Sequence, residues 1–336
     1  MRTGIDIYEN EIVDQYPKVL EILLRDHTTQ ENIFWGTDDY EHLGEKYHFG
    51  AQITEDLITG DNGSIIMPRV HKNKLLQISR SKEMAEVFTP SWVCNSQNNI
   101  IDNAWFGREG VFNHEISQAD GSKNWEINPK KIEFPKGKTW KNYVKDTRLE
   151  IACGEAPYIT SRYDSTTGEF INVEDRIGIL DRKLRVINEN VDTSGDWLKA
   201  AQTAYKNTYA YEWQGDSLLL ARESMLATFI ENYSHKFGKE PLLKSIQFIA
   251  YIISWNVWQM DGIKGVIPNS CEYQSKVSVN LFDETETKHI NCEGCEKGKI
   301  NRHNGIYCLI KDWPKKDLKT GKSGRKIKFV DLLNDK

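Results

Sequence analysis

The 336-residue chain is poor in the features that mark membrane and secreted proteins. It has no run of about 18 apolar residues, which a membrane-spanning helix requires. Its first residues, MRTGIDIYENEIVDQ, carry acidic side chains where a signal peptide needs a basic and then an apolar stretch. Six cysteines in 336 residues are too sparse for a disulfide scaffold. We therefore expect a cytoplasmic protein with no membrane association.

The bulk composition predicts a globular protein with a sizeable core. Apolar residues make up 39% of the chain and charged residues 28%, and the length suggests two or three structural units. The net charge of -5 argues against nonspecific binding of nucleic acid by the whole surface, although a local basic face stays open. We expect an N-terminal subdomain at 1–80, a main domain at 81–270 and a small Cys-rich module at 271–336.

Hydrophobic periodicity predicts an α/β architecture in the main domain. Residues 5–26 show helical spacing that Pro17 interrupts, and 34–80 is typical of short strands and loops. Residues 148–153 (RLEIAC) and 178–187 (GILDRKLRVI) are predicted strands. Residues 209–233 are predicted to form a strand, a turn and a helix, and 242–261 a helix and a strand. This alternation is typical of a Rossmann-like parallel sheet, here with an α+β N-terminal subdomain.

Acidic residues lie at the ends of three predicted strands, at Glu150, Glu212 and Asp261. Ligands of such sheets bind at the carboxyl ends of the strands. A first carboxylate suits a cationic amine, a second a ribose diol and a third an adenine amino group, and together they suit S-adenosylmethionine. Aromatic residues that suit its sulfonium follow nearby, at Tyr158, Trp213 and Trp258. Solvated caps are the plainer interpretation of each acid alone, and Asp181 is a rival for the ribose position.

Four segments in residues 80–270 resemble motifs of N6-adenine-specific DNA methyltransferases of restriction-modification systems. EVFTPSWVCNSQNNIID (86–102) is similar to the Phe-Thr-Pro segment of that family, and EIACGEA (150–156) to its acid-Pro-x-Cys-Gly-x-Gly turn. YAYEWQGDSLLLARESML (209–226) and WNVWQMDG (255–262) are similar to the second and third motifs. Ile151 and Ala156 depart from the pattern, where the family has Pro and Gly. The resemblance implies an S-adenosylmethionine-dependent methyltransferase sheet, with the cofactor bound by Thr89, Pro90, Glu150, Cys153, Gly154, Glu212 and Asp261.

One motif of that family is absent. Methylation of adenine N6 requires a flipped-out base, which the family holds with an Asn/Asp-Pro-Pro-Tyr/Phe segment. The chain has no Pro-Pro dipeptide, and the nearest text is EAPY at 155–158. We expect a split enzyme that resembles modification (M) subunits of restriction endonucleases: this chain binds S-adenosylmethionine, and a partner chain supplies the catalytic segment and DNA recognition. The terminal GRKIKFVDLLNDK is then the start of a fourth strand.

Two alternatives to the split enzyme stay open. A complete methyltransferase would use Pro157 and Tyr158 as a degenerate catalytic loop. A non-enzymatic DNA-binding or assembly subunit would have a decayed cofactor pocket. The basic segment WPKKDLKTGKSGRKIK (313–328) suits phosphate contacts with DNA, or equally a solvated surface loop.

Cysteines cluster near the C-terminus in HINCEGCEKGKINRHNGIYC, residues 289–308. Cys292 and Cys295 form a CxxC knuckle, and Cys308 follows as a third thiol. This spacing predicts most of a structural zinc site. We take His303 as the fourth ligand, with His289 and Cys271 as alternatives; three reduced thiols without metal are the plainer interpretation. Cys94 and Cys153 are expected to be small core residues.

Overall fold

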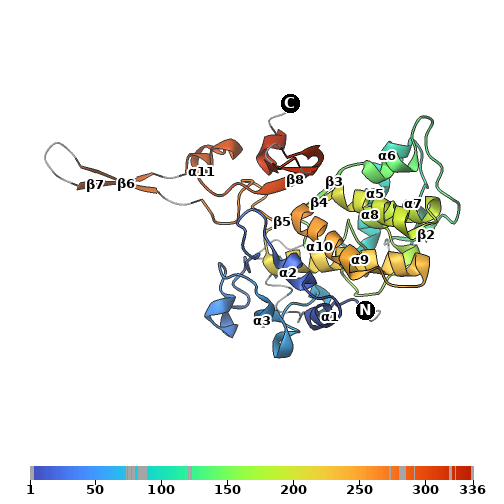
Figure 1. The fold of residues 1–336 in the computed structure, drawn as a ribbon, viewed down its shortest axis with the longest axis horizontal. Coiled ribbons are helices and arrows are strands. Elements are labelled where there is room, and N and C mark those ends of the chain that lie inside the picture. Colours follow the sequence, from blue (N-terminus) through green and yellow to red (C-terminus); the bar gives the residue numbers. More distant parts are fainter. Residues whose placement is uncertain are drawn as a thin grey trace.

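The computed structural model describes residues 4–72, 74, 77, 80–81, 89–119, 121, 123–271, 274–279, 285–290, 292–317, 320–321 and 323–333; of the two strands at 274–279 and 285–290 it describes the backbone alone. These residues form a mixed α/β body from which one hairpin projects as an arm (Figure 1). The segment 86–88, which begins the Phe-Thr-Pro motif, and the side chain of His289 lie outside the described residues.

A three-stranded parallel sheet stands at the centre of the described chain, in the order β3 (Arg148–Ile151), β4 (Thr208–Glu212), β5 (Val257–Gln259). Two helices, α7 (Ile179–Asn190) and α8 (Ser194–Lys206), connect β3 to β4. Two more, α9 (Gly215–Phe237) and α10 (Leu243–Asn256), connect β4 to β5. The predicted alternation of strands and helices at 209–261 is confirmed. The sheet is small, and three strands alone do not establish a Rossmann fold.

The segment 178–187 is a helix, so our prediction of a strand there is wrong. Its apolar residues Ile179, Leu180, Leu184 and Ile187 recur at helical spacing and are buried in α7. Asp181, Arg182 and Lys183 are also buried, because other groups pair with them: Arg182 Nη1 lies 2.7 Å from the Asp102 carboxylate. Asp181 accepts hydrogen bonds from the backbone of Ser161 and Gly178 at the start of the helix. It is therefore no strand-end acid and does not compete with Glu212.

The C-terminal residues do not supply a fourth strand to this sheet. β9 (Ser323–Lys328) instead pairs antiparallel with β8 (Leu309–Lys316) in a separate two-stranded sheet. The two strands are close in sequence, so a hairpin costs little loop-closure entropy. The arm is a second hairpin, formed by β6 (Gln274–Val279) and β7 (Thr285–Ile290), and α11 (Glu293–Lys297) follows it.

The N-terminal region packs on the helices that flank the sheet. Helices α1 (Glu9–Gln15) and α2 (Val19–Leu24) are separated at Pro17, as the sequence predicts. Residues 34–72 form α3 (Glu55–Ile58), short 3-10 turns and an isolated bridge, and not the strands that we expected.

Short 3-10 helices occur along the whole described chain. They are η1 (Glu41–Leu43), η2 (Glu45–Tyr47), η3 (Gly60–Asn62), η4 (Arg69–His71), η5 (Val173–Asp175), η6 (Ile300–Arg302) and η7 (Phe329–Leu333).

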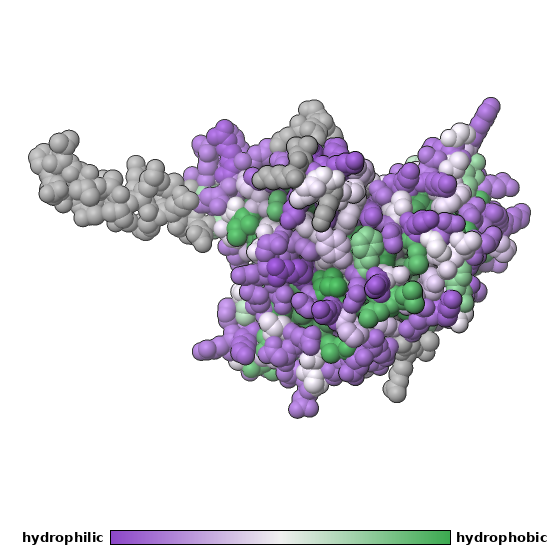
Figure 2. Space-filling view, viewed as in Figure 1, coloured by the Kyte–Doolittle hydropathy of each residue, from purple (hydrophilic) through white to green (hydrophobic). Residues whose placement is uncertain are grey.

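Residues 89–146 form a long helix and a hairpin beside the sheet. Helix α5 (Ser91–Phe106) is followed by β1 (Asn113–Ser117), β2 (Lys123–Ile127) and α6 (Trp140–Lys145). One buried apolar cluster runs from Ile7 through this region to Trp313 and joins the helices to the sheet. Figure 2 shows a mostly hydrophilic face with scattered apolar residues near its middle. Within the described ranges, no helix is both long and apolar enough to cross a membrane.

Candidate cofactor pocket and metal cluster

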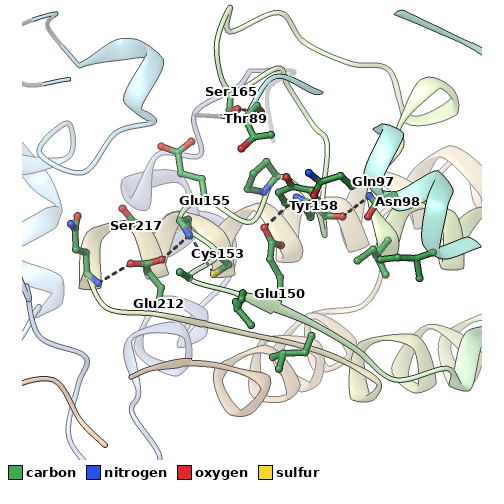
Figure 3. Close-up of a pocket in the computed structure, with 18 residues that line it drawn as sticks. Thr89, Gln97, Asn98, Glu150, Cys153, Glu155, Tyr158, Ser165, Glu212 and Ser217 are labelled. Atoms are coloured by element: carbon green, nitrogen blue, oxygen red, sulfur yellow. Dashed lines mark hydrogen bonds between the residues drawn. The ribbon is translucent and has the colours of Figure 1, made fainter. Parts of the chain in front are cut away.

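A pocket of about 450 Å³ opens at the carboxyl ends of β3 and β4 (Figure 3). This volume is within the usual range for small-molecule sites. Helix α5, the loop after β3 and the start of α9 form its walls. The residues that line it are Thr89, Gln97, Asn98, Ile101, Leu149, Glu150, Ile151, Ala152, Cys153, Gly154, Glu155, Pro157, Tyr158, Ser165, Ile179, Glu212, Gln214 and Ser217. Of the cofactor residues expected from the sequence, Thr89, Glu150, Cys153, Gly154 and Glu212 line this cavity, whereas Pro90 and Asp261 do not.

The loop after β3 has a left-handed backbone at alternate positions. Ala152, Gly154 and Ala156 have φ angles of 48°, 52° and 59°. Alanine is strained in this region, and such strain concentrates at binding sites. A Cβ atom added to Gly154 would meet no atom within 4 Å, so the chain at this residue faces open space. The sequence predicted a close backbone approach at Gly154 but not the left-handed conformation of the two alanines. Ala156 stands where the methyltransferase motif that it resembles has glycine.

Glu212 joins the ends of β3 and β4. Its carboxylate accepts hydrogen bonds from the backbone N–H of Gly154 (2.7 Å), Trp213 (2.8 Å) and Gln214 (3.2 Å). Burial nevertheless outweighs these bonds and raises the pKa of Glu212 above its usual value. Two carboxylate oxygens offer about four acceptor directions, so one remains for a ligand hydroxyl after the three backbone bonds.

Within the described part of the chain, Glu150 and Asn98 each carry a buried acceptor atom without a hydrogen-bond partner. The Glu150 carboxylate accepts a bond from Tyr158 N–H through Oε1 (3.4 Å), but its Oε2 has no partner among the described residues. Asn98 donates through Nδ2 to the carbonyls of Tyr158 (3.0 Å) and Ile177 (3.2 Å), and its Oδ1 is likewise without a partner. Figure 3 shows both residues bonded to the backbone of Tyr158. Because unmade bonds of this kind are costly, the pair favours a ligand that donates N–H groups.

Burial also changes the ionisation of Glu150. It raises the pKa of this carboxyl to about 8, and the nearby Glu212 charge adds to the shift. Backbone hydrogen bonds from residues 158 and 159 act in the opposite direction but are weaker. A cation beside Glu150 would lower this pKa and stabilise the ionised form.

The Phe-Thr-Pro segment lies at the edge of the pocket. Thr89 lines the cavity, and its carbonyl accepts a hydrogen bond from Ser165 Oγ (2.8 Å). Pro90 is the N-cap residue of α5 and does not line the cavity. Cys153 lines the wall as a buried thiol whose pKa burial holds well above its usual value, so it is no thiolate nucleophile.

Asp261 is not part of this pocket. Its Oδ1 accepts hydrogen bonds from Ile263 N–H (3.0 Å) and Lys264 N–H (3.1 Å), and its Oδ2 pairs with Lys264 Nζ at 3.2 Å. These contacts fix the turn that follows β5. Several polar residues that the sequence did not indicate also line the cavity, among them Asn98, Gln214 and Ser217. Asn98 and Ile101 are three residues apart and follow Pro90, which is typical of two side chains on one face of a helix. This spacing could have predicted that α5 forms a wall of the cavity.

A second group of functional side chains lies at the base of the arm. Cys271, Cys292, Cys295 and His303 each direct one potential ligand atom to a common point, and these atoms lie within 4.8 Å of one another. His303 Nδ1 is 3.6 Å from Cys271 Sγ, 3.5 Å from Cys292 Sγ and 3.6 Å from Cys295 Sγ. This group can hold a metal ion such as zinc.

Backbone groups around the cluster favour the thiolate form of Cys292. Its Sγ accepts a hydrogen bond from Asn304 N–H at 3.3 Å. Burial raises the pKa of Cys292, but the bonds from the backbone of Asn304 and Cys295 and from His303 outweigh it and lower the pKa to about 6. A thiolate is the form that binds metal.

Cys308, which we expected as a third ligand, lies elsewhere. It is fully buried, and its Sγ donates to the carbonyl of Gln259 at 3.4 Å in the core beneath β5. Cys271, an alternative in the sequence analysis, stands in its place. The knuckle Cys292, Cys295 and the ligand His303 do come together as predicted.

Comparisons with protein-family models, with curated proteins and with solved structures found no match for this chain.

Proposed function

We propose that the pocket binds S-adenosylmethionine and that the chain is the cofactor-binding subunit of an adenine-N6 DNA methyltransferase of a restriction-modification system. The proposal rests on two buried acceptors that have no partner among the residues the structure describes, Glu150 Oε2 and Asn98 Oδ1, in one cavity with the Glu212 carboxylate. A ligand with an ammonium group and a ribose suits these acceptors: the ammonium group would lie at Glu150 of β3 and the ribose at Glu212 of β4.

The residues of the pocket fit this cofactor by chemistry. Glu150 and Asn98 would accept hydrogen bonds from the ammonium group, and Glu212 from one ribose hydroxyl. The open face of Gly154 leaves room for close approach of a ligand to the backbone. When bound, the cofactor supplies an electrophilic methyl group. Gln214 and Ser217 provide the remaining polar contacts, and we assign no cofactor contact to Asp261.

The resemblance in the sequence supports the methyltransferase part of the proposal, and the missing Pro-Pro segment supports a partner chain. DNA contact is assigned to the β8–β9 hairpin, which carries exposed Lys315, Lys316, Lys326 and Lys328. A second candidate is a complete methyltransferase. One observation favours it, because Pro157 and Tyr158 line the same cavity as Glu150.

Calorimetric titration of S-adenosylmethionine tests the cofactor assignment. We expect binding to the wild-type chain, and a loss of about 10- to 100-fold in Glu212→Ala, as for a hydrogen bond to a charged group. Asp261→Asn is the matched control, since it alters a carboxylate outside the cavity and should bind normally. A folded wild-type chain that gives no heat, alone or with the product of a neighbouring reading frame, would contradict the proposal.

Methyl transfer separates the split from the complete enzyme. The assay follows radiolabelled methyl groups from S-adenosylmethionine into adenine-containing DNA. Transfer by the chain alone, abolished in Tyr158→Ala, would favour the complete enzyme. Transfer only after a partner with a Pro-Pro-Tyr segment is added would support the split enzyme.

A further inference from the structure

The four residues of the metal cluster bracket the arm. Cys271 precedes β6, while Cys292 and Cys295 follow β7 and His303 lies beyond α11. The two ends of the hairpin therefore meet at the cluster, and the arm leaves the body from this point (Figure 1). A metal that joins Cys271 to the later ligands closes a loop that contains the whole hairpin. This restricts the unfolded chain more than a metal bound only by residues 292–303 would.

The distances from the three sulfur atoms to the imidazole nitrogen match tetrahedral zinc. Ligands at about 2.3 Å for Zn–S and about 2.0 Å for Zn–N place a sulfur and a nitrogen about 3.5 Å apart at the tetrahedral angle. The three separations between cysteine Sγ atoms and His303 Nδ1 are 3.5 to 3.6 Å. Three thiolates and one imidazole are also the soft donor set that selects zinc over magnesium or calcium.

Two glycines allow the ligands to approach. A Cβ atom on Gly294 would lie 2.6 Å from both the backbone nitrogen and Nδ1 of His303. A Cβ atom on Gly305 would lie 2.7 Å from Ser270 Oγ and 3.0 Å from Cys271 Sγ. Both sites therefore require glycine for packing, independently of the cysteine pattern.

The cluster is also connected to the central sheet. Ile267 N–H donates to the carbonyl of Ile306 (2.8 Å), and Cys308 N–H donates to the carbonyl of Gly265 (3.1 Å). The Tyr307 hydroxyl accepts from His303 N–H at 2.8 Å. These bonds link the segment that carries His303 to the turn after β5.

We propose that Cys271, Cys292, Cys295 and His303, through Nδ1, bind one Zn²⁺ that fastens the base of the β6–β7 arm to the carboxyl end of β5. Because the protein supplies all four ligands, the site is closed and structural, and no position is left for a substrate. The proposal is independent of the cofactor pocket.

Metal content of the purified full-length chain tests the proposal by elemental analysis. We expect one zinc per chain in the wild type. In Cys271→Ser the zinc affinity should fall at least tenfold, so that the zinc content of the purified variant falls below one per chain. Cys308→Ser is the matched control and should retain one zinc. Retention by Cys271→Ser with loss in Cys308→Ser would overturn the ligand set, as would a folded wild-type chain that binds no zinc.

Cobalt substitution keeps the test valid if a serine variant does not fold. The wild-type chain with Co²⁺ should show the intense visible bands of tetrahedral coordination and sulfur-to-cobalt charge transfer. The charge-transfer intensity should fall by about one third in Cys295→Ser, because two of three thiolates remain. An octahedral spectrum in the folded wild type would overturn the proposal.

Discussion

The cofactor pocket and the metal cluster are built in opposite ways. The pocket uses residues at the ends of neighbouring parallel strands, and two of its buried acceptors have no partner in the described chain. The cluster gathers four soft ligands about one point at the base of a hairpin. The first arrangement leaves hydrogen-bonding capacity for an exchangeable ligand, whereas the second is complete once one ion is present. The pocket is therefore suited to a ligand that exchanges, and the cluster to an ion that stays bound.

Removal of metal should have the largest effect and should be confined to one of the two regions. Structural zinc contributes on the order of 10 kcal/mol to the folding of small metal modules. Chelation should therefore increase backbone hydrogen exchange across residues 292–308 by several orders of magnitude. Titration of S-adenosylmethionine into the chelated chain should give an affinity within about threefold of the untreated chain. If removal of the metal also abolished S-adenosylmethionine binding, the two sites would not be independent.

Glu150→Gln should weaken S-adenosylmethionine binding by about 10- to 100-fold, because the neutral amide cannot pair with a cation. Proton release sharpens this prediction. Burial raises the pKa of the free Glu150 carboxyl to about 8, so it is mostly protonated at pH 7 and must ionise when the cation binds. Titration in buffers of different ionisation enthalpy should show close to one proton released by the wild type and none by Glu150→Gln. Equal proton release in both proteins would assign the proton to another group.

The same variant should be more stable than the wild type in the absence of ligand. A carboxyl whose folded pKa is raised binds its proton more tightly in the folded state, so its ionisation costs stability as pH rises from its unfolded value near 4.5 toward about 8. The melting temperature of Glu150→Gln should exceed that of the wild type by an amount that grows between pH 5 and pH 8. A constant difference across this range would exclude Glu150 as the titrating group.

Ala156→Gly should have the smallest effect. Ala156 has a φ of 59° and is fully buried, so glycine relieves left-handed strain without loss of a large contact. We expect a gain of about 1 kcal/mol in the free energy of unfolding, measured by denaturant titration. Ala200→Gly, in the middle of α8, is the matched control and should lose about 1 kcal/mol. A loss in both variants would indicate that the loop is not strained at this residue.

Part of the pocket could be predicted from the sequence. Glu150, Gly154 and Glu212 stand at strand ends in an alternating pattern, and parallel pairing brings such ends to one edge. The same argument did not succeed for Asp261, although it also follows a strand. Its carboxylate is used by the backbone of its own turn, a local competition that alternation of strands and helices does not reveal.

The sequence by itself determined the short-range features: the helical and extended segments at 209–261, the strand-end glutamates, and the Cys292, Cys295 and His303 ligands. Their spacing is set by a few backbone dihedral angles, so local pattern suffices. Only the tertiary structure decided between Cys271 and Cys308 as the ligand and placed Asn98 in the pocket wall. These outcomes depend on which distant segments pack together, because burial and hydrogen bonding across the fold outweigh local preference.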